Sequence, residues 1–182
     1  MERLQLIQAL KFYITPYAEE STYIKSFLEL LESKDAYLRT NLPGHMTGSV
    51  WIVNSTKQKT LLVHHVNLKK WVQPGGHADG DENILRVALR EAEEETGIKK
   101  FKITPSIFDI DIHTIPARNN FQEHLHYDIR FLIEADEHDP IIVSEESHDV
   151  KWFAIGDLEN YTTERSVLRM KEKIYLTKYN LH

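Results

Sequence analysis

The sequence predicts an α/β or α+β sandwich, in which helices pack on a sheet of strands of unequal length. Apolar residues at helical spacing in the first 33 residues give way, after residue 43, to short β-type runs at 49–53 and 60–63. Helical and β-type segments then alternate along the rest of the chain. The sequence contains no internal repeat and no low-complexity segment, so a solenoid or a bundle is disfavoured.

The length and charge of the chain restrict the kinds of partner it can bind. With 182 residues, 41% of them hydrophobic, the chain is expected to form one domain with a substantial core. The formal net charge of -6 opposes nonspecific attraction to nucleic acid or an anionic membrane. A small polyanionic substrate would therefore need a local cation. We expect a small-molecule substrate, no long nucleic acid and no membrane partner.

The residue types exclude thiol chemistry. The chain contains no cysteine, so disulfides, thiolate metal sites and cysteine nucleophiles are all excluded. The N-terminal residues lack the apolar region of a secretory signal, and no apolar run approaches the roughly 20 residues that a membrane span requires. We therefore expect a cytoplasmic protein that uses oxygen or nitrogen ligands for any catalysis.

The first 40 residues are interpreted as a helical extension. Residues 3–13 place Leu4, Ile7, Leu10 and Tyr13 at helical spacing, and a second helix is expected to follow Thr15-Pro16 and to end near residue 33. Turn chemistry at residues 41–44 marks the boundary between an extension (1–40) and a catalytic domain (41–182). The extension is expected to pack on its own domain, with homodimer formation and coverage of the substrate site as the alternatives.

Further strands are expected at 102–114, 123–134 and 149–153, followed by a closing helix at about 163–178. In the strands at 102–114 and 123–134, acidic residues and histidines occupy every second position and so share one face. These residues are Asp109, Asp111, His113, His124, His126 and Asp128. With a hairpin loop at 115–122, Asp111 would oppose His126 and His113 would oppose His124. This face is interpreted either as a pocket wall that binds phosphate, base or a further metal, or as a hydrogen-bonded or solvated sheet surface.

The most informative segment runs from residue 76 to residue 98. Its second half is expected to form a helix that ends at Gly97 in a left-handed cap. Helical geometry puts Glu91, Glu94 and Glu95 on one broad face. There their charges repel one another and oppose the helix dipole, and each effect destabilises the helix by about 0.3 kcal/mol. A hard cation such as Mg²⁺ would relieve both penalties, whereas a solvated charge run is the alternative. Arg90, four residues before Glu94, is expected to hold that carboxylate.

The spacing of this segment matches the pattern G-x5-E-x7-R-E-U-x-E-E-x-G-U. The matching residues are Gly76, Glu82, Arg90, Glu91, Ala92, Glu94, Glu95, Gly97 and Ile98. This pattern resembles the box of the Nudix hydrolase family (MutT-like), with Ala92 standing where the family favours a bulkier aliphatic residue. Residues 71–76 resemble the strand and glycine turn that lead into the box, and residues 150–153 resemble the late tryptophan strand. The resemblance covers roughly residues 45–160 and implies a Nudix-type α/β/α sandwich with a mixed sheet.

The resemblance implies a metal-dependent attack of water on a diphosphate, with Mg²⁺ or Mn²⁺ as cofactor. It implies that the metal ligands are Glu91, Glu94, Glu95 and the backbone carbonyl of Gly76. Glu82 would support the loop or a second ion. The family often takes its general base from outside the box, so Glu145 and Glu146 are candidates, and activation of water by a box glutamate such as Glu94 is the alternative.

Candidate substrate contacts lie on both sides of the box. They are Lys70, His77, His113, His124 and His126, with Lys69 and Arg118 as further cations. The favoured substrate is a nucleoside diphosphate derivative or a nucleoside triphosphate. Isopentenyl diphosphate isomerisation is disfavoured because the family members that catalyse it use a cysteine, and this chain has none. Hydrolysis of RNA 5′ ends is disfavoured because the chain is acidic overall and has no clear basic stripe. A noncatalytic Nudix-like binding or interaction module would be expected to tolerate loss of the box glutamates, all of which are present.

Overall fold

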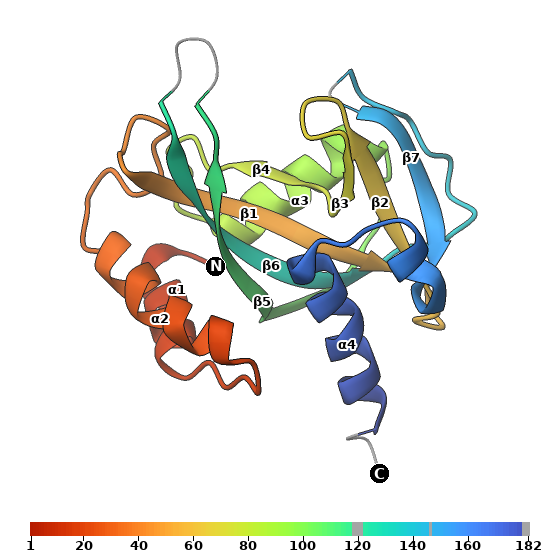
Figure 1. Cartoon of the computed structure of the whole chain (residues 1–182), viewed down its shortest axis with the longest axis horizontal. Helices are drawn as coiled ribbons and strands as arrows, with labels where there is room; N and C mark the ends of the chain where they lie inside the picture. Colours follow the sequence, from red (N-terminus) through yellow and green to blue (C-terminus); the bar gives the residue numbers. More distant parts are fainter. Residues whose placement is uncertain (118–121, 146, 180–182) are drawn as a thin grey trace.

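The computed structural model describes residues 1–117, 122–145 and 147–179. Within these ranges seven strands form one mixed sheet, shown in Figure 1: β1 (Gly44–Val53), β2 (Lys59–His65), β3 (Lys70–Val72), β4 (Gly75–His77), β5 (Lys102–Ile115), β6 (His124–Glu134) and β7 (Ser147–Ala154). The main strand order is β3-β2-β1-β6-β5, while β4 pairs with β1 and β7 pairs with β2. β1 and β6 run parallel, and the other pairs are antiparallel.

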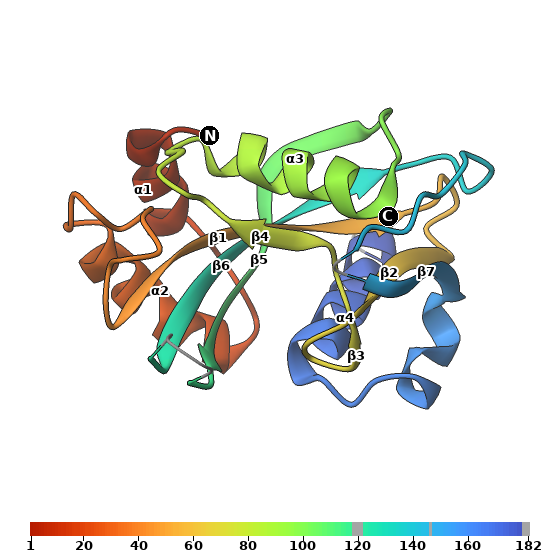
Figure 2. The same cartoon turned by 90° about the horizontal axis from the view of Figure 1, so that it is seen from above.

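Helices cover both faces of the sheet. They are α1 (Arg3–Lys11), α2 (Ala18–Leu30), α3 (Ile84–Thr96), the 3-10 helix η1 (Ile155–Asn160) and α4 (Arg165–Tyr179). Figure 2 shows α3 on one face and α4 on the opposite face. This is the α/β/α arrangement with a mixed sheet that the sequence predicts. None of the described helices is long and apolar enough to cross a membrane.

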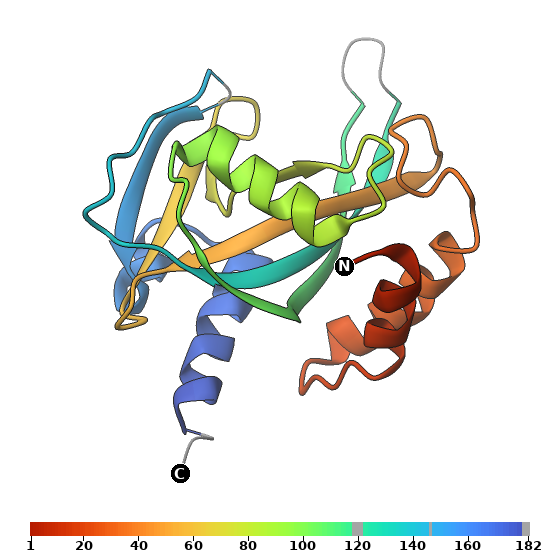
Figure 3. The same ribbon diagram turned by 180° about the vertical axis from the view of Figure 1, so that it is seen from behind.

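Two apolar cores lie on the two faces because side chains alternate along each strand. Along β1, Val50 and Ile52 point into the core beneath α3, and Trp51 and Val53 point into the core beneath α4. Figure 3 shows α3 lying across the strands on its face. The helix begins at the cap residue Asn83, whose side chain accepts the Arg86 N–H at 3.1 Å.

The two N-terminal helices are packed on the α3 face. Leu6, Leu10 and Phe27 are fully buried in the same core as the residues beneath α3. The expected stripe was wrong at Leu4, which is 77% exposed, because the helix turns Leu6 rather than Leu4 toward the core. The second helix begins at Ala18 and ends at Leu30, two and three residues inside the expected limits. Division of the chain at residue 40 stays a prediction.

The register of the β5–β6 hairpin differs from the expected one. Asp111 lies opposite Asp128, His113 opposite His126 and Ile115 opposite His124. The expected pairings of Asp111 with His126 and of His113 with His124 were therefore wrong by two residues. β5 extends to residue 115 and β6 begins at residue 124, so the loop lies one residue later than expected, which moves every partner by two.

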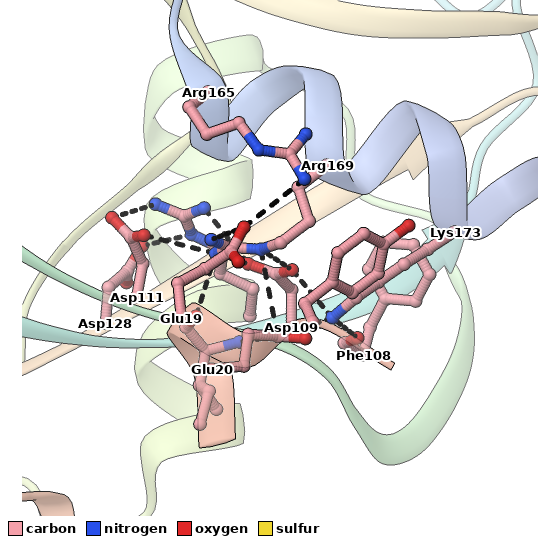
Figure 4. Close-up of polar contacts among 12 residues, drawn as sticks. Glu19, Glu20, Phe108, Asp109, Asp111, Asp128, Arg165, Arg169 and Lys173 are labelled. Atoms are coloured by element: carbon pink, nitrogen blue, oxygen red, sulfur yellow. Dashed lines mark hydrogen bonds and ion pairs between the residues drawn. The ribbon is translucent and has the colours of Figure 1, made fainter. Parts of the chain in front are cut away.

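A buried network of ions joins the sheet to α4 (Figure 4). Arg169 donates to Asp109 at 2.8 and 2.9 Å and to Asp111 at 3.1 Å, and Arg130 donates to the same two carboxylates at 3.1 and 3.2 Å. Lys173 Nζ lies 2.7 Å from Asp109. Burial raises the pKa of Asp111, but the charges of the two neighbouring arginines and the hydrogen bond to His113 together outweigh burial, so the net pKa lies below its ordinary value. The acidic part of the predicted polar face is thus hydrogen-bonded and neutralised within the protein.

Candidate active site

The box carboxylates meet the backbone of β4 at two points. The Gly75 N–H donates to Glu95 Oε2 at 2.8 Å. A Cβ atom at Gly76 would lie 2.3 Å from Glu91 Oε2, so only glycine lets this carboxylate approach the strand so closely. Both glutamates come from the last two turns of α3, whose end is fixed by Gly97 at φ 73°. The helix and the glycine strand therefore gather two carboxylates and the Gly76 backbone in one place.

Arg90 holds the Glu91 carboxylate rather than that of Glu94. Its Nη2 donates to Glu91 Oε1 at 2.6 Å and to the His77 carbonyl at 2.9 Å. Its Nε lies 3.9 Å from Glu94 Oε1, beyond hydrogen-bond distance. The expected pairing with Glu94 is present as an ion pair, but the hydrogen bond goes to Glu91, because the bond to the β4 backbone draws the guanidinium toward the strand. The hydrogen bond that Arg90 donates to Glu91 raises the pKa of Arg90, which keeps the guanidinium charged.

Glu94 does not join the other two carboxylates. Its side chain is 61% exposed, whereas that of Glu91 is 16% exposed. Glu94 borders an apolar groove on the outer side of α3 that is also lined by Leu85, Leu89 and Phe101. A residue three positions from Glu91 points about 60° away from it around the helix, which accounts for the separation. The roles expected for Glu94 in metal binding and water activation stay predictions.

Two of the candidates outside the helix, Glu82 and Lys70, form ion pairs with other residues. Glu82 is paired with Arg3 at 2.8 Å, a contact that ties the loop before α3 to the N-terminus. Glu145 is exposed in the turn before β7, while Glu146 lies outside the described residues. The Lys70 Nζ lies 2.6 Å from Glu164. Arg118 also lies outside the described residues.

Four histidines gather beside β4, on the sheet face opposite α3. They are His45, His77, His124 and His126, and their ligating nitrogens all lie within 4.8 Å of one another. Burial lowers the pKa of His77 to about 4 and that of His126 to about 2, so both rings are neutral at neutral pH. The ring of His113, which was expected beside them, lies 5.4 Å from that of His126 and binds Asp111.

His45 was missed by the sequence reasoning. The expected β-type run began at residue 49, so His45 lay outside it. Its register partner in the parallel pair is His126, and the same alternation places Thr47 and Ser49 beside Asp128. Both hydroxyls donate to that carboxylate, at 3.0 and 2.7 Å. Had β1 been started five residues earlier, the alternation of polar residues would have identified this face.

A second feature that the sequence reasoning missed is an aromatic cavity near the end of β7. It has a volume of about 320 Å³ and is lined by Trp71, Lys151, Trp152, Phe153, Ala154, Asp157 and Tyr161. The rings of Trp71 and Tyr161 each lie 4.7 Å from that of Phe153. Trp71 belongs to β3, four residues before the glycine strand, so the cavity and the carboxylates are connected through one short stretch of chain.

Comparison with known proteins identifies relatives of this site. A family model described as the NUDIX domain matches residues 44–172. A probable DHNTP pyrophosphohydrolase of Lactococcus lactis is 30% identical over 134 residues, which cover 72% of this chain and 79% of the relative. The asymmetrical bis(5′-nucleosyl)-tetraphosphatase of Mus musculus is 45% identical over 51 residues, but these cover only 28% of this chain and 35% of that protein.

Solved structures share the fold. A C. elegans Ap4A hydrolase in a binary complex superposes with a TM-score of 0.60 at 18% identity, over 75% of this chain and 98% of the other. The E. coli dihydroneopterin triphosphate pyrophosphohydrolase superposes with a TM-score of 0.54 at 14% identity, over 74% and 95% of the two chains. At these identities the likeness establishes the arrangement of helices and strands.

Proposed function

The chain belongs to the Nudix family and is a pyrophosphohydrolase that cleaves a diphosphate linkage, and we propose that its substrate is a nucleoside diphosphate derivative or a nucleoside triphosphate. The observation that supports this proposal best is the contact of the Glu91 and Glu95 carboxylates with the glycine strand. A noncatalytic module would have no need of a complete box held in this geometry.

We propose that Glu91, Glu95 and the Gly76 carbonyl hold Mg²⁺ or Mn²⁺, with Glu94 completing the set from the outer side of α3. Nudix hydrolases generally use a divalent ion, and hard divalent ions prefer oxygen donors of this kind. The close approach of Glu91 to Gly76 fits such an ion, because it leaves the carboxylate beside the Gly76 backbone with no side chain between them. When bound, the ion neutralises phosphate oxygens and lowers the pKa of a bound water.

The protein's own residues hold this geometry in place. Arg90 acts as a positioning residue, since its guanidinium fixes the Glu91 carboxylate and the backbone of His77 at once. Glu95 accepts the Gly75 N–H and so keeps β4 against the end of α3. We propose Glu94, Glu145 or Glu146 as the general base that accepts the proton of the attacking water. Of these, Glu94 lies on the same helix as the other box carboxylates.

The aromatic cavity supports a substrate with a planar ring. Trp71, Phe153 and Tyr161 present ring faces and edges suited to a stacked base, and Lys151 lies 5.1 Å from the centroid of Trp71. The relatives named above act on pterin triphosphate or on bis(5′-nucleosyl) tetraphosphates, which also combine a ring with linked phosphates. Lys70 is proposed to contact substrate, while a substrate contact by His77 stays a prediction.

The remaining substrate and partner predictions follow from charge and composition. His113 is proposed as further lining of the substrate site, while substrate contacts by His124 and His126 stay predictions. The net charge of -6 favours a small molecule over long nucleic acid. A cytoplasmic location and a homodimer stay predictions, and the size of the protein in solution would decide the second of these.

The proposal is tested by a panel of nucleotide sugars, nucleoside triphosphates, bis(5′-nucleosyl) tetraphosphates and dihydroneopterin triphosphate with Mg²⁺ or Mn²⁺. Hydrolysis in ¹⁸O-labelled water is expected to place the label on a phosphate product. Glu91→Gln is expected to lower kcat by about 100-fold or more, because the substitution removes the charge and keeps the shape. The matched control is Glu93→Gln on the same helical turn, where the side chain is exposed and lies 3.9 Å from Lys99.

Two results would contradict this proposal. The first is the absence of metal-dependent hydrolysis of every compound in the panel. The second is a Glu91→Gln variant that turns over as fast as Glu93→Gln. The Glu94→Gln variant separates the roles within the box: full activity would remove Glu94 from the proposed metal ligands and leave Glu91 and Glu95.

A further inference from the structure

The four clustered histidines come from three strands that meet at one end of the sheet. His45 is on β1, His77 is on β4, and His124 and His126 are on β6. His45 is the register partner of His126, and Thr47, two residues along β1, is the register partner of His77. Register partners share a face of the sheet, so all four side chains project to the face opposite α3. Their convergence is therefore fixed by strand pairing rather than by loop conformation.

The distances between the rings match coordination of a single ion. The ligating nitrogens lie within 4.8 Å of one another, and Nε2 of His124 lies 3.3 Å from Nε2 of His126. Two nitrogens bound to a tetrahedral ion at 2.0–2.1 Å are separated by about 3.3–3.4 Å. The pair on β6 is thus already at the required spacing. The longest separation must shrink by roughly 1.4 Å, a change that rotation about the side-chain torsions can supply.

Hydrogen bonds orient two of the rings toward the centre of the cluster. His124 Nδ1 lies 2.8 Å from the Gln122 carbonyl, and His45 Nδ1 lies 3.4 Å from the Asn41 carbonyl. A carbonyl only accepts, so each Nδ1 carries the proton and each Nε2 is left as an acceptor, which for His124 faces His126 Nε2. Metal-binding histidines have this arrangement, in which the outer N–H donates to a carbonyl and fixes the tautomer.

One of these acceptor nitrogens is buried without a partner. His45 is 2% exposed, and its Nε2 has no hydrogen-bond partner among the residues that the structure describes. A buried polar atom that lacks a partner costs about 1–3 kcal/mol, so native proteins seldom leave one unless an ion or a water occupies the space. The neighbouring groups around it are the other imidazoles, whose rings lie 4.9–5.2 Å away. An atom that accepts several nitrogen lone pairs at once would satisfy this arrangement.

We propose that His45, His77, His124 and His126 form a binding site for a transition-metal ion of the zinc class. Imidazole nitrogen is a ligand that Zn²⁺ favours, whereas the carboxylates of α3 are suited to Mg²⁺ or Mn²⁺, so the two sites differ in ligand type. Four protein ligands would fill the tetrahedral positions, as in structural zinc sites. The bound ion would tie β1, β4 and β6 together at the end of the sheet and would steady the glycine strand on which the box carboxylates rest. The proposal does not depend on the identity of the hydrolysed substrate.

Zinc binding to the full-length chain tests this proposal. Protein stripped with a chelator is titrated with Zn²⁺ by calorimetry in excess Mg²⁺, which occupies the oxygen ligands of the box. One Zn²⁺ per chain is expected to bind, and Co²⁺ in its place is expected to give the intense visible bands of tetrahedral coordination. His126→Asn is expected to weaken Zn²⁺ binding by about 100-fold or more, because loss of even an outer-shell partner changes metal affinity by about 10–100-fold.

Matched variants keep the test decisive. His124→Asn removes a more exposed ligand and serves if His126→Asn fails to fold, which circular dichroism would reveal. His148→Asn is the control, since His148 neighbours His64 on a different part of the sheet. Glu91→Gln should leave Zn²⁺ binding unchanged, so the histidine site is judged separately from hydrolysis. The proposal would be overturned if the folded wild-type chain did not bind Zn²⁺, or if both histidine variants bound Zn²⁺ as tightly as wild type. Loss of Zn²⁺ binding in Glu91→Gln would also overturn it.

Discussion

The buried ion network leads to a specific prediction about Arg169. This guanidinium is 1% exposed and makes four hydrogen bonds, to Asp109 Oδ1 and Oδ2, to the Ile110 carbonyl and to Asp111 Oδ1. Arg169→Met keeps the length and packing of the side chain but leaves Ile110 O without this donor and Asp109 with only its other two cations. Removal of one partner from a buried ion pair typically costs about 3–5 kcal/mol.

We expect a value near the lower end of this range, about 3 kcal/mol. Asp109 keeps Arg130 Nη1 at 3.1 Å and Lys173 Nζ at 2.7 Å, so its charge is only partly uncompensated. The assay is urea denaturation followed by circular dichroism, which gives the free energy of unfolding. The control is Arg165→Met on the same helix, where the side chain is 52% exposed and its pairing with Glu172 contributes no more than about 1 kcal/mol. A loss at Arg169 no greater than that at Arg165 would refute the structural role of the network.

Three further predictions follow from the same structure. Gly76→Ala is expected to displace the Glu91 carboxylate and to lower kcat by about 100-fold, with little change in the urea midpoint. Gly156→Ala is the control, since a Cβ there meets an ordinary contact, and it should preserve kcat and the urea midpoint. Equal kcat values in the two variants would contradict the close approach of Glu91 to Gly76. Because the pKa of Asp111 is lowered in the folded protein, its stabilising contribution is complete above the unfolded pKa of about 3.9 and is lost as pH falls below that value. The free energy of unfolding should therefore fall less steeply with acid pH in Asp111→Asn than in wild type. Leu10→Ala should cost about 2–5 kcal/mol in urea denaturation if the N-terminal helix belongs to the main core, and a cost near zero would detach it.

Local patterns in the sequence predicted the helix at the centre of the site. The helical spacing of its apolar residues, and Gly97 at its end, were enough to define α3, whereas the grouping of its carboxylates with Gly76 was implied by the resemblance to the Nudix box. The direction of Glu94 was less certain, because one broad helical face spans residues that point about 60° apart. The partner of Arg90 depended on the His77 carbonyl, which the spacing along the helix does not reveal.

Contacts between distant segments were not visible in the sequence. The hairpin loop between β5 and β6 could be placed one residue earlier without disturbing the alternation, and this shift moved the partner of His113 by two positions. His45 joins His126 through a parallel pairing across some 80 residues, for which no local signal exists. Arg169 is likewise buried against β5, in a network that the sequence of the closing helix does not reveal.

Mn²⁺ binding, followed by electron paramagnetic resonance, tests most directly whether the α3 carboxylates form the metal site. The signal of free Mn²⁺ decreases when the ion binds, so a titration gives the affinity of the carboxylates that meet the glycine strand. Wild type is expected to bind Mn²⁺, and Glu95→Gln is expected to bind at least about tenfold more weakly, while Glu93→Gln binds like wild type. Equal Mn²⁺ affinity in all three proteins would contradict the assignment of the box carboxylates as the metal site.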